Sequence, residues 1–522
     1  MSSLSPPVFL GGLAASFDRH ADRVALELPD ESLSYGRLAR IAGGVGELFR
    51  SRGVERGDRV ALYLGDKPAL VRAHLGALWI GAVPLPLNPR FTVPELAYFL
   101  RDSVARAVLF DDESMPRAES AIAHLPGESG NKVVGISAGE VGSAAECDRA
   151  PAGVKADDPA LLLYSSGTTG EPKGVVHTQA NLAAAVTALA RCWRFSEDDV
   201  LANVLPLFHI HGLSFATHVA WLSGATMLVG TAFHPRGTLD LVDRATVFMG
   251  VPPYYYSWLD RPEFAERAAR WSRLRLATCG SAPIRADVLP RLEEVLGRPL
   301  INRYGMTESH VITSLPLDGP TPHGSVGVPL DGMEVRVVSD DRNPCLDEQV
   351  GAVHVRGPNL FREYWGRPQA TREAFDKDGW FDTGDVGLWK PTPVGASEGR
   401  SPGDRPSAGS PAGFLTLVGR SKELILVGGY NVYPAVVERA LIECPGVREV
   451  AVFGLPDPKR GERVAAAIVA DPKAIDERQV KEFCRSRLVD YQCPAAVFFV
   501  EELPRNTMGK VLRRELQGRF SP

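Results

Sequence analysis

The chain has 522 residues, with 58 basic and 63 acidic side chains, a formal net charge of −5 and a pI near 6.2. This length fits two to four domains of roughly 100–200 residues, or one large domain with an appendage. The composition, 44% hydrophobic and 23% charged, is that of a globular protein and argues against wholesale disorder. The near-balanced charge gives no electrostatic footprint for a nucleic acid or an anionic membrane.

Cysteine usage and the N-terminus bear on the compartment. The seven cysteines are scattered and none forms a C-x-x-C pair, so we expect neither a disulfide framework nor a zinc cluster. A reducing, cytoplasmic location is therefore favoured. No basic residue precedes the short apolar run Val8–Phe17, which argues against a signal peptide. The apolar stretch Leu75–Leu87 contains two prolines and is too short to span a bilayer.

The first half of the chain alternates between short apolar runs and helical periodicity. Strands are expected at Arg59–Leu64, Val83–Leu87, Ala105–Phe110 and Lys132–Ile136, and a helix at Pro68–Ile80. This βαβ rhythm predicts mostly parallel sheets covered by helices.

Lys390–Gly413 differs from its surroundings, because its 24 residues include five glycines, five prolines and four serines. Such a composition buries too little apolar surface to offset chain entropy, so we expect a mobile loop inserted in a turn, with a functional linker as the alternative.

The last hundred residues have a different pattern. Helices are expected at Ala435–Ile442 and Glu477–Leu488, and strands at Glu449–Phe453 and Arg463–Val469. These elements predict a compact α+β unit of about 100 residues, which is long enough to form a separate domain.

The strongest local signal is a run rich in glycine and hydroxyl groups, Ser165–Gly174, which follows the expected strand Leu161–Leu163. Glycines allow backbone amides to approach phosphate oxygens, and hydroxyls and a lysine add donors and positive charge. The run does not fit the G-x-x-x-x-G-K-[ST] pattern of a P-loop. It predicts phosphate contacts from Ser165, Ser166, Gly167, Thr168, Thr169 and Lys173.

Six further motifs follow in order. They are Pro206-Leu207-Phe208-His209, Gly280-Ser281-Ala282-Pro283, Arg303-Tyr304-Gly305-Met306-Thr307-Glu308, Gly379-Trp380-Phe381-Asp382-Thr383-Gly384-Asp385, Gly419-Arg420-Ser421-Lys422 and Pro504-Arg505-Asn506-Thr507-Met508-Gly509-Lys510. Together with Ser165–Gly174 they resemble the adenylate-forming superfamily, which comprises acyl- and aryl-CoA synthetases, peptide-synthetase adenylation domains and beetle luciferases. The resemblance spans roughly residues 15–520.

The resemblance implies an architecture. We expect an α/β fold, in which a large N-terminal domain of mostly parallel sheets covered by helices also carries a β-barrel-like subdomain. Residues 1–419 would form this AMP- and acid-binding domain. Residues 420–522 would form a small α+β domain that carries the catalytic lysine and rotates about a hinge at Lys422, two residues after Arg420. A few residues suffice to absorb such a rotation.

The resemblance also implies site residues. Lys510 would enter from the C-terminal domain and touch the carboxylate and the α-phosphate, where a mobile cation stabilises developing charge. Glu308 would ligate Mg²⁺, which prefers hard oxygen ligands. Thr307 would bond the α-phosphate, Tyr304 would stack on adenine, and Asp385 would accept hydrogen bonds from the ribose.

Other expected contacts belong to the acid and the thiol. His209 is expected as an aromatic gate, with a general-base role open between it and His211. The glycine loop Gly428-Gly429-Tyr430 would meet the pantetheine arm of CoA. Some relatives carry a second lysine where this chain has Leu426. Nucleotide and acid contacts are further expected from Gly280, Ser281, Ala282, Arg303, Gly305 and Met306, and the pocket wall from Phe208 and from Met249-Gly250-Val251.

The acid itself stays open at this point. Arg303 and Arg236 are both candidate cations for a second carboxylate, such as that of a malonate, and fatty, aryl and bulkier acids are alternatives. We expect an ATP-dependent carboxylic acid–CoA ligase that uses ATP, Mg²⁺ and CoA. The alternatives are a stand-alone enzyme that loads an acyl carrier protein, a luciferase-type oxidation, and a nucleotide-binding module without catalysis.

Overall fold

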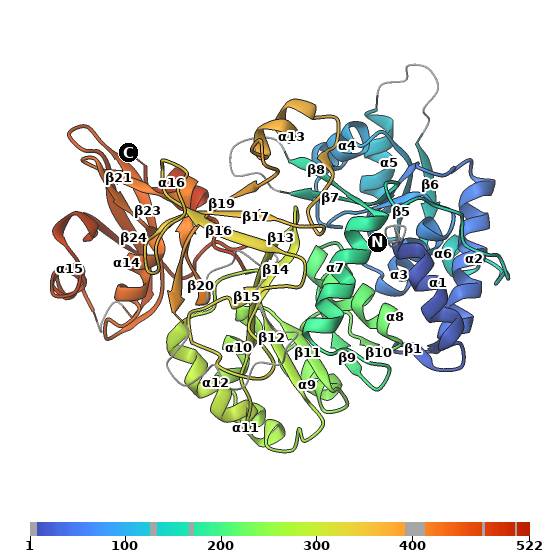
Figure 1. The fold of residues 1–522 in the computed structure, drawn as a ribbon, viewed down its shortest axis with the longest axis horizontal. Coiled ribbons are helices and arrows are strands. Elements are labelled where there is room, and N and C mark those ends of the chain that lie inside the picture. Colours follow the sequence, from blue (N-terminus) through green and yellow to red (C-terminus); the bar gives the residue numbers. More distant parts are fainter. Residues whose placement is uncertain are drawn as a thin grey trace.

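The computed structural model describes residues 8–125, 133–165, 172–391, 413–471, 475–506 and 509–521. Two large β-sheets with their covering helices form the core of the N-terminal part of the chain, and a small orange-to-red domain at the C-terminus packs beside it (Figure 1). The mixed α/β architecture and the separate C-terminal domain that the sequence predicts are confirmed.

The first sheet is wholly parallel, with strand order β4-β3-β5-β6. Its strands are β3 (Arg59–Leu62), β4 (Val83–Pro86), β5 (Ala105–Phe110) and β6 (Val134–Ser137). The crossover from β3 to β4 is α3 (Lys67–Trp79), which begins at a side-chain cap from Asp66 and packs on α2 (Tyr35–Ser51). All four strands expected here exist, although β3 and β4 end earlier than predicted and β6 lies two residues later.

The second sheet has nine strands in the order β15-β14-β13-β12-β11-β9-β10-β1-β2. From β1 to β13 neighbouring strands run parallel, and antiparallel strands close both edges. The strands are β1 (Val24–Glu27), β2 (Ser32–Ser34), β9 (Val200–Asn203), β10 (Thr226–Val229), β11 (Val247–Gly250), β12 (Leu276–Cys279), β13 (Ile301–Met306), β14 (His310–Ser314) and β15 (Val328–Pro329). In parallel α/β sheets ligands bind beyond the carboxyl ends of the strands, where β11, β12 and β13 deliver three of the predicted motifs.

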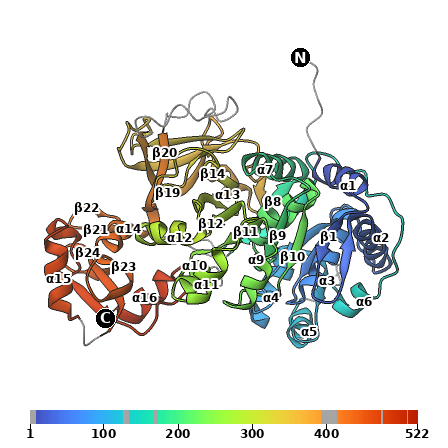
Figure 2. The same ribbon diagram turned by 90° about the horizontal axis from the view of Figure 1, so that it is seen from below.

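Helices cover both sheets (Figures 1 and 2). Those on the N-terminal half are α1 (Phe9–Arg19), α4 (Val93–Asp102), α5 (Met115–Ala123), α6 (Ala138–Gly142), α7 (Gln179–Cys192) and α8 (Val219–Ser223). Those beside β11–β13 are α9 (Gly237–Val242), α10 (Pro252–Leu259), α11 (Pro262–Ala268), the 3-10 turn η2 (Ala286–Val288) and α12 (Leu289–Leu296). A π-helix, η1 (His211–His218), runs directly into α8. π-helical segments are rare and occur often at functional sites.

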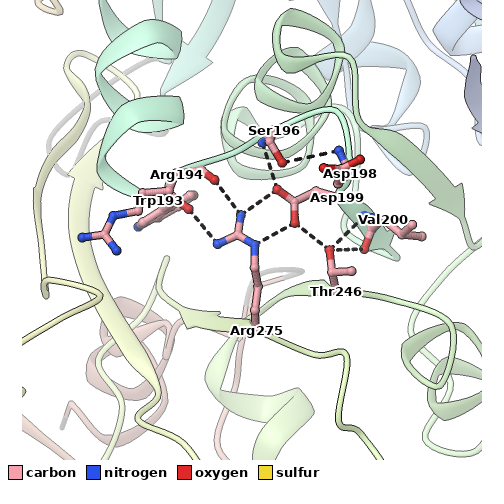
Figure 3. A network of polar contacts seen from close by, with 8 residues as sticks. All are labelled: Trp193, Arg194, Ser196, Asp198, Asp199, Val200, Thr246 and Arg275. Atoms are coloured by element: carbon pink, nitrogen blue, oxygen red, sulfur yellow. Dashed lines mark hydrogen bonds and ion pairs between the residues drawn. The ribbon is translucent and has the colours of Figure 1, made fainter.

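A buried ion pair ties the amino ends of the strands together (Figure 3). The Arg275 guanidinium donates to both carboxylate oxygens of Asp199, at 2.7 and 2.6 Å, and to the Trp193 and Arg194 carbonyl oxygens. The Thr246 hydroxyl donates to Asp199 at 2.7 Å. Because these residues precede β9, β11 and β12, the network holds three neighbouring strands in register. The carboxyl ends that face the predicted site are thereby aligned.

Two antiparallel sheets complete the fold before the C-terminal domain begins. One has the order β16-β17-β19-β20 and comprises β16 (Glu334–Val338), β17 (Gly351–Arg356), β19 (Phe381–Pro391) and β20 (Gly413–Arg420). The other has the order β18-β8-β7 and comprises β7 (Pro159–Ser165), β8 (Lys173–Thr178) and β18 (Glu363–Tyr364), which the short helix α13 (Pro368–Ala374) follows.

The predicted loop at Lys390–Gly413 is wrong at its ends. Lys390 pairs with Phe414 and Pro391 with Gly413, so the edges of the segment are antiparallel strand. The rest of the predicted loop, residues 392–412, lies outside the described residues.

The C-terminal domain has a sheet in the order β22-β21-β24-β23, and β25 pairs with β24. Its elements are β21 (Ile425–Val427), β22 (Tyr430–Val432), α14 (Pro434–Leu441), β23 (Val447–Asp457), β24 (Gly461–Ala470), α15 (Glu477–Arg485), β25 (Ala496–Phe499) and α16 (Arg513–Phe520). The two strands β23 and β24 are longer than predicted, because their ladder continues to the turn at Asp457, and α15 ends before Leu488.

Within the described ranges, no helix combines the length and the apolar character that crossing a bilayer requires.

Replacement of Arg275 by methionine should lower the free energy of unfolding by about 3–5 kcal/mol, because Asp199, with a 3% exposed side chain, loses the only cation that an ion pair gives it among the described residues. Urea unfolding at pH 7 measures this loss. The hydrogen bonds that Asp199 accepts outweigh its burial and hold its pKa below the ordinary value. The stabilisation is therefore present above about pH 4 and is lost as the pH falls through the folded-state pKa.

The matched control is Arg194→Ala, which removes an exposed ion pair with Asp318 and should cost at most about 1 kcal/mol. Equal losses for the two variants would contradict a structural role for the buried pair.

Candidate active site

The predicted motifs converge at the carboxyl edge of the nine-stranded sheet. Strand β13 ends in Arg303-Tyr304-Gly305-Met306, and the turn after it carries Thr307 and Glu308. The neighbouring strand β12 leads into Gly280-Ser281-Ala282, and β11 ends at Gly250. The C-terminal domain faces this edge, since Gly509 contacts Pro253 at the start of α10.

The nucleotide side of the site is organised around Asp385. The Tyr304 hydroxyl donates to Asp385 Oδ2 at 2.6 Å, and Arg420 Nε lies 3.1 Å from Oδ1. Burial raises the pKa of Asp385, and Arg420, Tyr304 and Lys510 act in the opposite direction. A buried carboxylate with oriented donors on both oxygens is a fixed acceptor, as recognition of ribose hydroxyls requires.

Lys510 lies opposite Asn506, next to the bridge between Arg505 and Val511. The Asn506 amide donates to the Lys510 carbonyl oxygen and the Lys510 amide donates to Asn506 Oδ1, both at 2.9 Å. The lysine is half-buried. Burial lowers its pKa, with Arg420 contributing, and Glu423 and Asp385 oppose this. The predicted lysine thus shares an electrostatic environment with Asp385 and Arg420, although 90 residues separate it from Arg420 in the sequence.

Glu308 is buried beside the stem of the glycine-rich run. The Tyr364 hydroxyl donates to Glu308 Oε1 at 3.3 Å, and a hydrogen bond with Ser165 also favours the charged form. The ammonium of Lys173 lies 4.7 Å from the centre of the Tyr364 ring. Burial outweighs these contacts and raises the pKa of Glu308. Ser166, Gly167, Thr168 and Thr169 lie outside the described residues.

The turn that carries Thr307 and Glu308 is fixed through its backbone. His177 Nε2 donates to the Thr307 carbonyl oxygen at 2.7 Å, and the Phe361 amide donates to the Glu308 carbonyl oxygen at 2.7 Å. Burial lowers the pKa of His177 to about 4, so its ring is neutral at physiological pH. Neither His177 nor Phe361 is among the residues that the sequence singles out.

On the acid side, Arg303 occupies a pocket without an acidic partner. Its side chain is almost fully buried, at 4% exposure, and lies over the Phe215 ring at 4.7 Å from its centre. Arg303 Nη2 donates to Ser281 Oγ at 3.4 Å, and Nε has no hydrogen-bond partner among the described residues. A side chain on Gly280 would collide with the guanidinium, since an added Cβ would lie 2.6 Å from Cζ.

The charge of Arg303 is therefore uncompensated. Burial lowers its pKa to about 10, which still leaves it protonated at neutral pH. No carboxylate among the described residues pairs with it, whereas Arg236, the other predicted cation, is exposed and pairs with Glu263 at 2.9 Å. Arg236 thus lies on the surface in an ion pair, whereas Arg303 is buried beside other residues predicted for the acid site.

The two candidate histidines lie beside Arg303. The His211 amide donates to His209 Nδ1 at 3.2 Å, which places the proton of the neutral His209 ring on Nε2. Burial, with Arg303 contributing, lowers the pKa of His209 to about 4 and that of His211 further. His211 Nδ1 meets Ser281 Oγ at 3.1 Å. Both rings are neutral at physiological pH, so either is a hydrogen-bonding group in the resting site rather than a cation.

Ser281 binds both neighbours from an unusual backbone conformation. Its φ is +69°, in the left-handed region that costs energy for a residue with a side chain. This geometry brings one hydroxyl within reach of Arg303 and His211. The motif predicts Ser281 as a site residue, but only the fold reveals the strained backbone and the contact of the neighbouring Arg303 with Phe215 on η1.

The predicted CoA residues lie elsewhere in this arrangement. Gly428, Gly429 and Tyr430 form the exposed turn between β21 and β22, and Tyr430 stacks on Tyr491 with ring centres 4.5 Å apart. Lys422 is exposed in the turn between β20 and β21. The hydrogen bonds of the described part do not join the glycine turn to the pocket around Arg303.

Comparison with known proteins agrees with this geometry. Residues 13–365 match the family model of the AMP-binding enzyme, and residues 436–510 match that of the AMP-binding enzyme C-terminal domain. A mitochondrial malonate–CoA ligase from Homo sapiens is 33% identical over 100% of this chain and 93% of its own length. A feruloyl-CoA synthase from an Amycolatopsis species is 35% identical, with 94% of each chain covered.

The solved structures include the ATP-bound form of MatB from Rhodopseudomonas palustris, which is 34% identical, with a TM-score of 0.89 over 98% of this chain and 99% of that chain. The apo form of the same protein has a TM-score of 0.78 at the same coverage. Over the whole chain, this structure is thus more similar to the ATP-bound form than to the apo form. The chain belongs to the AMP-binding enzyme family, the adenylate-forming superfamily that its motifs resemble, and is an AMP-forming acid–CoA ligase that uses ATP and CoA.

Proposed function

We propose that this ligase activates a short dicarboxylic acid of the malonate type. The observation that carries the proposal is the buried, uncompensated charge of Arg303. Burying a charge without a partner costs several kcal/mol, so a site that keeps one is suited to receive the opposite charge from its ligand. One carboxylate of the acid would react, and the other would pair with Arg303.

The surroundings of Arg303 favour a small acid. Phe215 lies on one side of the guanidinium and Gly280 on another, and Ser281 and His211 supply neutral hydrogen-bonding groups nearby. A fatty acid or a feruloyl group would bury apolar surface against the cation and leave its charge unpaired. The malonate–CoA ligase among the relatives supports the same substrate class.

In the first step, a carboxylate oxygen attacks the α-phosphorus of ATP and pyrophosphate leaves. Lys510 and Thr307 would stabilise the negative charge that develops on the carboxylate and the α-phosphate. Tyr304 and Asp385 hold the nucleoside, and the Ser165–Lys173 stem holds the phosphates. In the second step, the thiol sulfur of CoA attacks the acyl carbon and AMP leaves.

Glu308 fits a Mg²⁺ site. It is a buried carboxylate that lies next to the predicted phosphate-binding stem, and its hydrogen bonds come from Ser165, Tyr364 and its own backbone amide rather than from a cation. Mg²⁺ is usually held by one or two carboxylates together with phosphate oxygens and water, and it would neutralise part of the triphosphate charge. The residues of this chain hold the carboxylate in place and shield it from solvent.

We further propose that the domain boundary lies at residues 419/420 and that residues 420–522 rotate about Lys422 between the two steps. Gly428, Gly429 and Tyr430 are exposed in the present arrangement. Their task in the second step, to border the pantetheine arm, requires that the C-terminal domain turn this face toward the acid pocket. Glycine at both positions keeps the turn narrow, since both have a positive φ.

The substrate class is tested with purified protein, Mg-ATP and a pooled panel of malonates, fatty acids, benzoates and cyclic terpenoid acids, with and without CoA. We expect malonyl-CoA or a substituted malonyl-CoA by mass spectrometry, only when CoA is present. A monocarboxylic acyl-CoA as the main product contradicts the dicarboxylate proposal. An acyl-adenylate that is never transferred to CoA would instead favour an acyl carrier protein as the acceptor.

Arg303→Met keeps the volume of the pocket but removes the cation. We expect kcat/KM for malonate to fall by about 10²-fold or more, because the second carboxylate is left buried without a partner. Activity with a short monocarboxylic acid such as butyrate should rise or stay unchanged. The matched control is Arg236→Met, which should leave both activities as in the wild type. An equal loss with both acids would mean that Arg303 is structural.

The substitution Glu308→Gln should lower the activity of the enzyme and raise its stability. Formation of the acyl-adenylate is expected to fall by about 10²-fold or more, because a charge that positions Mg-ATP is lost. The melting temperature should rise. Burial raises the pKa of Glu308, so its ionisation opposes folding at a pH above the unfolded value of about 4.3.

The gain in melting temperature should therefore be larger at pH 8 than at pH 4, since below the unfolded pKa of about 4.3 the glutamate is mostly protonated in the folded and in the unfolded state. Calorimetry at the two pH values checks this sign. A variant that is less stable at pH 8 would contradict the unfavourable burial of the charge.

A further inference from the structure

A hydrogen bond away from the proposed hinge joins the N-terminal domain to strand β23 of the C-terminal domain. Arg285 Nη1 donates to the Arg448 carbonyl oxygen at 2.9 Å. Arg285 lies between β12 and η2, and Figure 2 shows α10 and α12 facing the C-terminal domain here. This contact therefore crosses the interface between the two domains, which the proposed rotation of the C-terminal domain has to separate.

The Arg285 side chain is aimed by its own domain. Asp287 accepts from Arg285 Nε and Nη2 at 3.2 and 2.9 Å, which leaves Nη1 directed at the partner carbonyl. The Tyr256 hydroxyl oxygen accepts a hydrogen bond from the Arg285 backbone amide at 3.0 Å, and the Arg285 guanidinium lies 5.6 Å from the centre of the Tyr256 ring. The fork of the guanidinium is therefore preorganised before the domains meet.

The acceptor, the Arg448 carbonyl oxygen, lies where the pairing of β23 is irregular. The pairing of β23 with β24 shifts register between Val447 and Glu449, so Arg448 lies at an irregularity of the ladder. A residue at a β-bulge is left out of the ladder hydrogen bonds. Its carbonyl oxygen is free to accept Arg285.

The next residue of β23 leads to the catalytic loop. Glu449 Oε2 accepts from Arg505 Nη2 at 2.5 Å, and Arg505 Nη1 donates to the Gly509 carbonyl oxygen at 2.7 Å. Gly509 directly precedes Lys510. A continuous set of contacts therefore runs from Arg285 through the start of β23 and Arg505 to the peptide that carries the lysine.

A second contact holds the same loop against the same helix that carries Tyr256. Gly509 has φ of +78°, and a Cβ on it would lie 2.3 Å from Cγ of Pro253. The backbone of the loop thus packs on the Pro253 ring at the start of α10. The loop is thus held by an apolar contact with Pro253, and Arg285 adds a polar contact to the same domain.

We propose that Arg285 is a positioning residue for the adenylation step: it docks the C-terminal domain through the Arg448 carbonyl so that Lys510 reaches the active site. This rests on the proposed function, in which Lys510 serves the first step and the domain rotates before the second. Because rotation breaks the contact, Arg285 contributes to the first half-reaction and not to the second.

The experiment measures the two half-reactions separately in wild type and Arg285→Ala. Pyrophosphate released in a single turnover with Mg-ATP and malonate, without CoA, reports the first. Free thiol released in a single turnover from malonyl-CoA and AMP reports the second, run in reverse. We expect the first rate to fall about five- to thirty-fold, as the loss of one charge-assisted hydrogen bond at a partly exposed site implies, and the second to change less than twofold.

Two further variants exclude a merely structural effect. Arg285→Lys keeps a donor and should recover part of the adenylation rate. Arg291→Ala is the matched control, because Arg291 is also an exposed arginine that donates to a backbone carbonyl, that of Leu259, but within its own domain. It should leave both half-reactions and the melting temperature as in the wild type.

Equal losses in both half-reactions, or no loss in the first, would overturn the role of Arg285. A wild type that acts on a different acid would overturn the dicarboxylate proposal instead. The comparison is then run with that acid, so that the two proposals fail separately.

Discussion

Burial of charge at the carboxyl edge of the nine-stranded sheet is the constraint on which the rest of the structure depends. Arg303, Glu308 and Asp385 are each less than 10% exposed, and burial shifts the pKa of each toward its neutral form, because a buried charge loses solvation. The three side chains differ in how far neighbouring groups compensate for the lost solvation. Asp385 has a cation and a hydroxyl on its two oxygens, Glu308 has two hydroxyl partners, and Arg303 has one distant serine. The least compensated charges are those that the proposed ligands complete.

The scaffold holds these charged groups in place before a ligand binds. The pair of Asp199 and Arg275 fixes the amino ends of β9, β11 and β12, so the opposite ends have little freedom to relax away from one another. Preorganised groups at a sheet edge lose little entropy when a ligand arrives. The strained backbone of Ser281 fits the same view, since strain persists only where the surrounding structure over-determines the conformation.

The proposed mechanism gives the C-terminal domain a different task, because its contacts would have to place Lys510 for the first step and release it for the second. Its contacts with the N-terminal domain away from the hinge include one hydrogen bond from Arg285 and the packing of Gly509 on Pro253, rather than a buried ion pair. Small, partly exposed interfaces of this kind permit domain motion. The exposed face at Gly428–Tyr430 is available for a second arrangement.

The sequence by itself determined the family, the order of the motifs and the type of most elements, because hydrophobic periodicity and turn residues act locally. β5 agrees with the prediction at both ends, and β3, β4 and α3 differ by one or two residues at an end. The loop at residues 390–413 was wrong at its ends, since strand pairing there is a long-range contact that composition does not encode.

Only the tertiary structure decided between Arg303 and Arg236, which have equal standing in the sequence. One is enclosed by Phe215, Gly280 and Ser281 without an acid, and the other is neutralised by Glu263 on the surface. Arg285 and the bulge at Arg448 carry no motif either. The physical reason is the same in each case: the energy of a charge depends on what the fold packs around it, and residues far apart in the chain supply those surroundings.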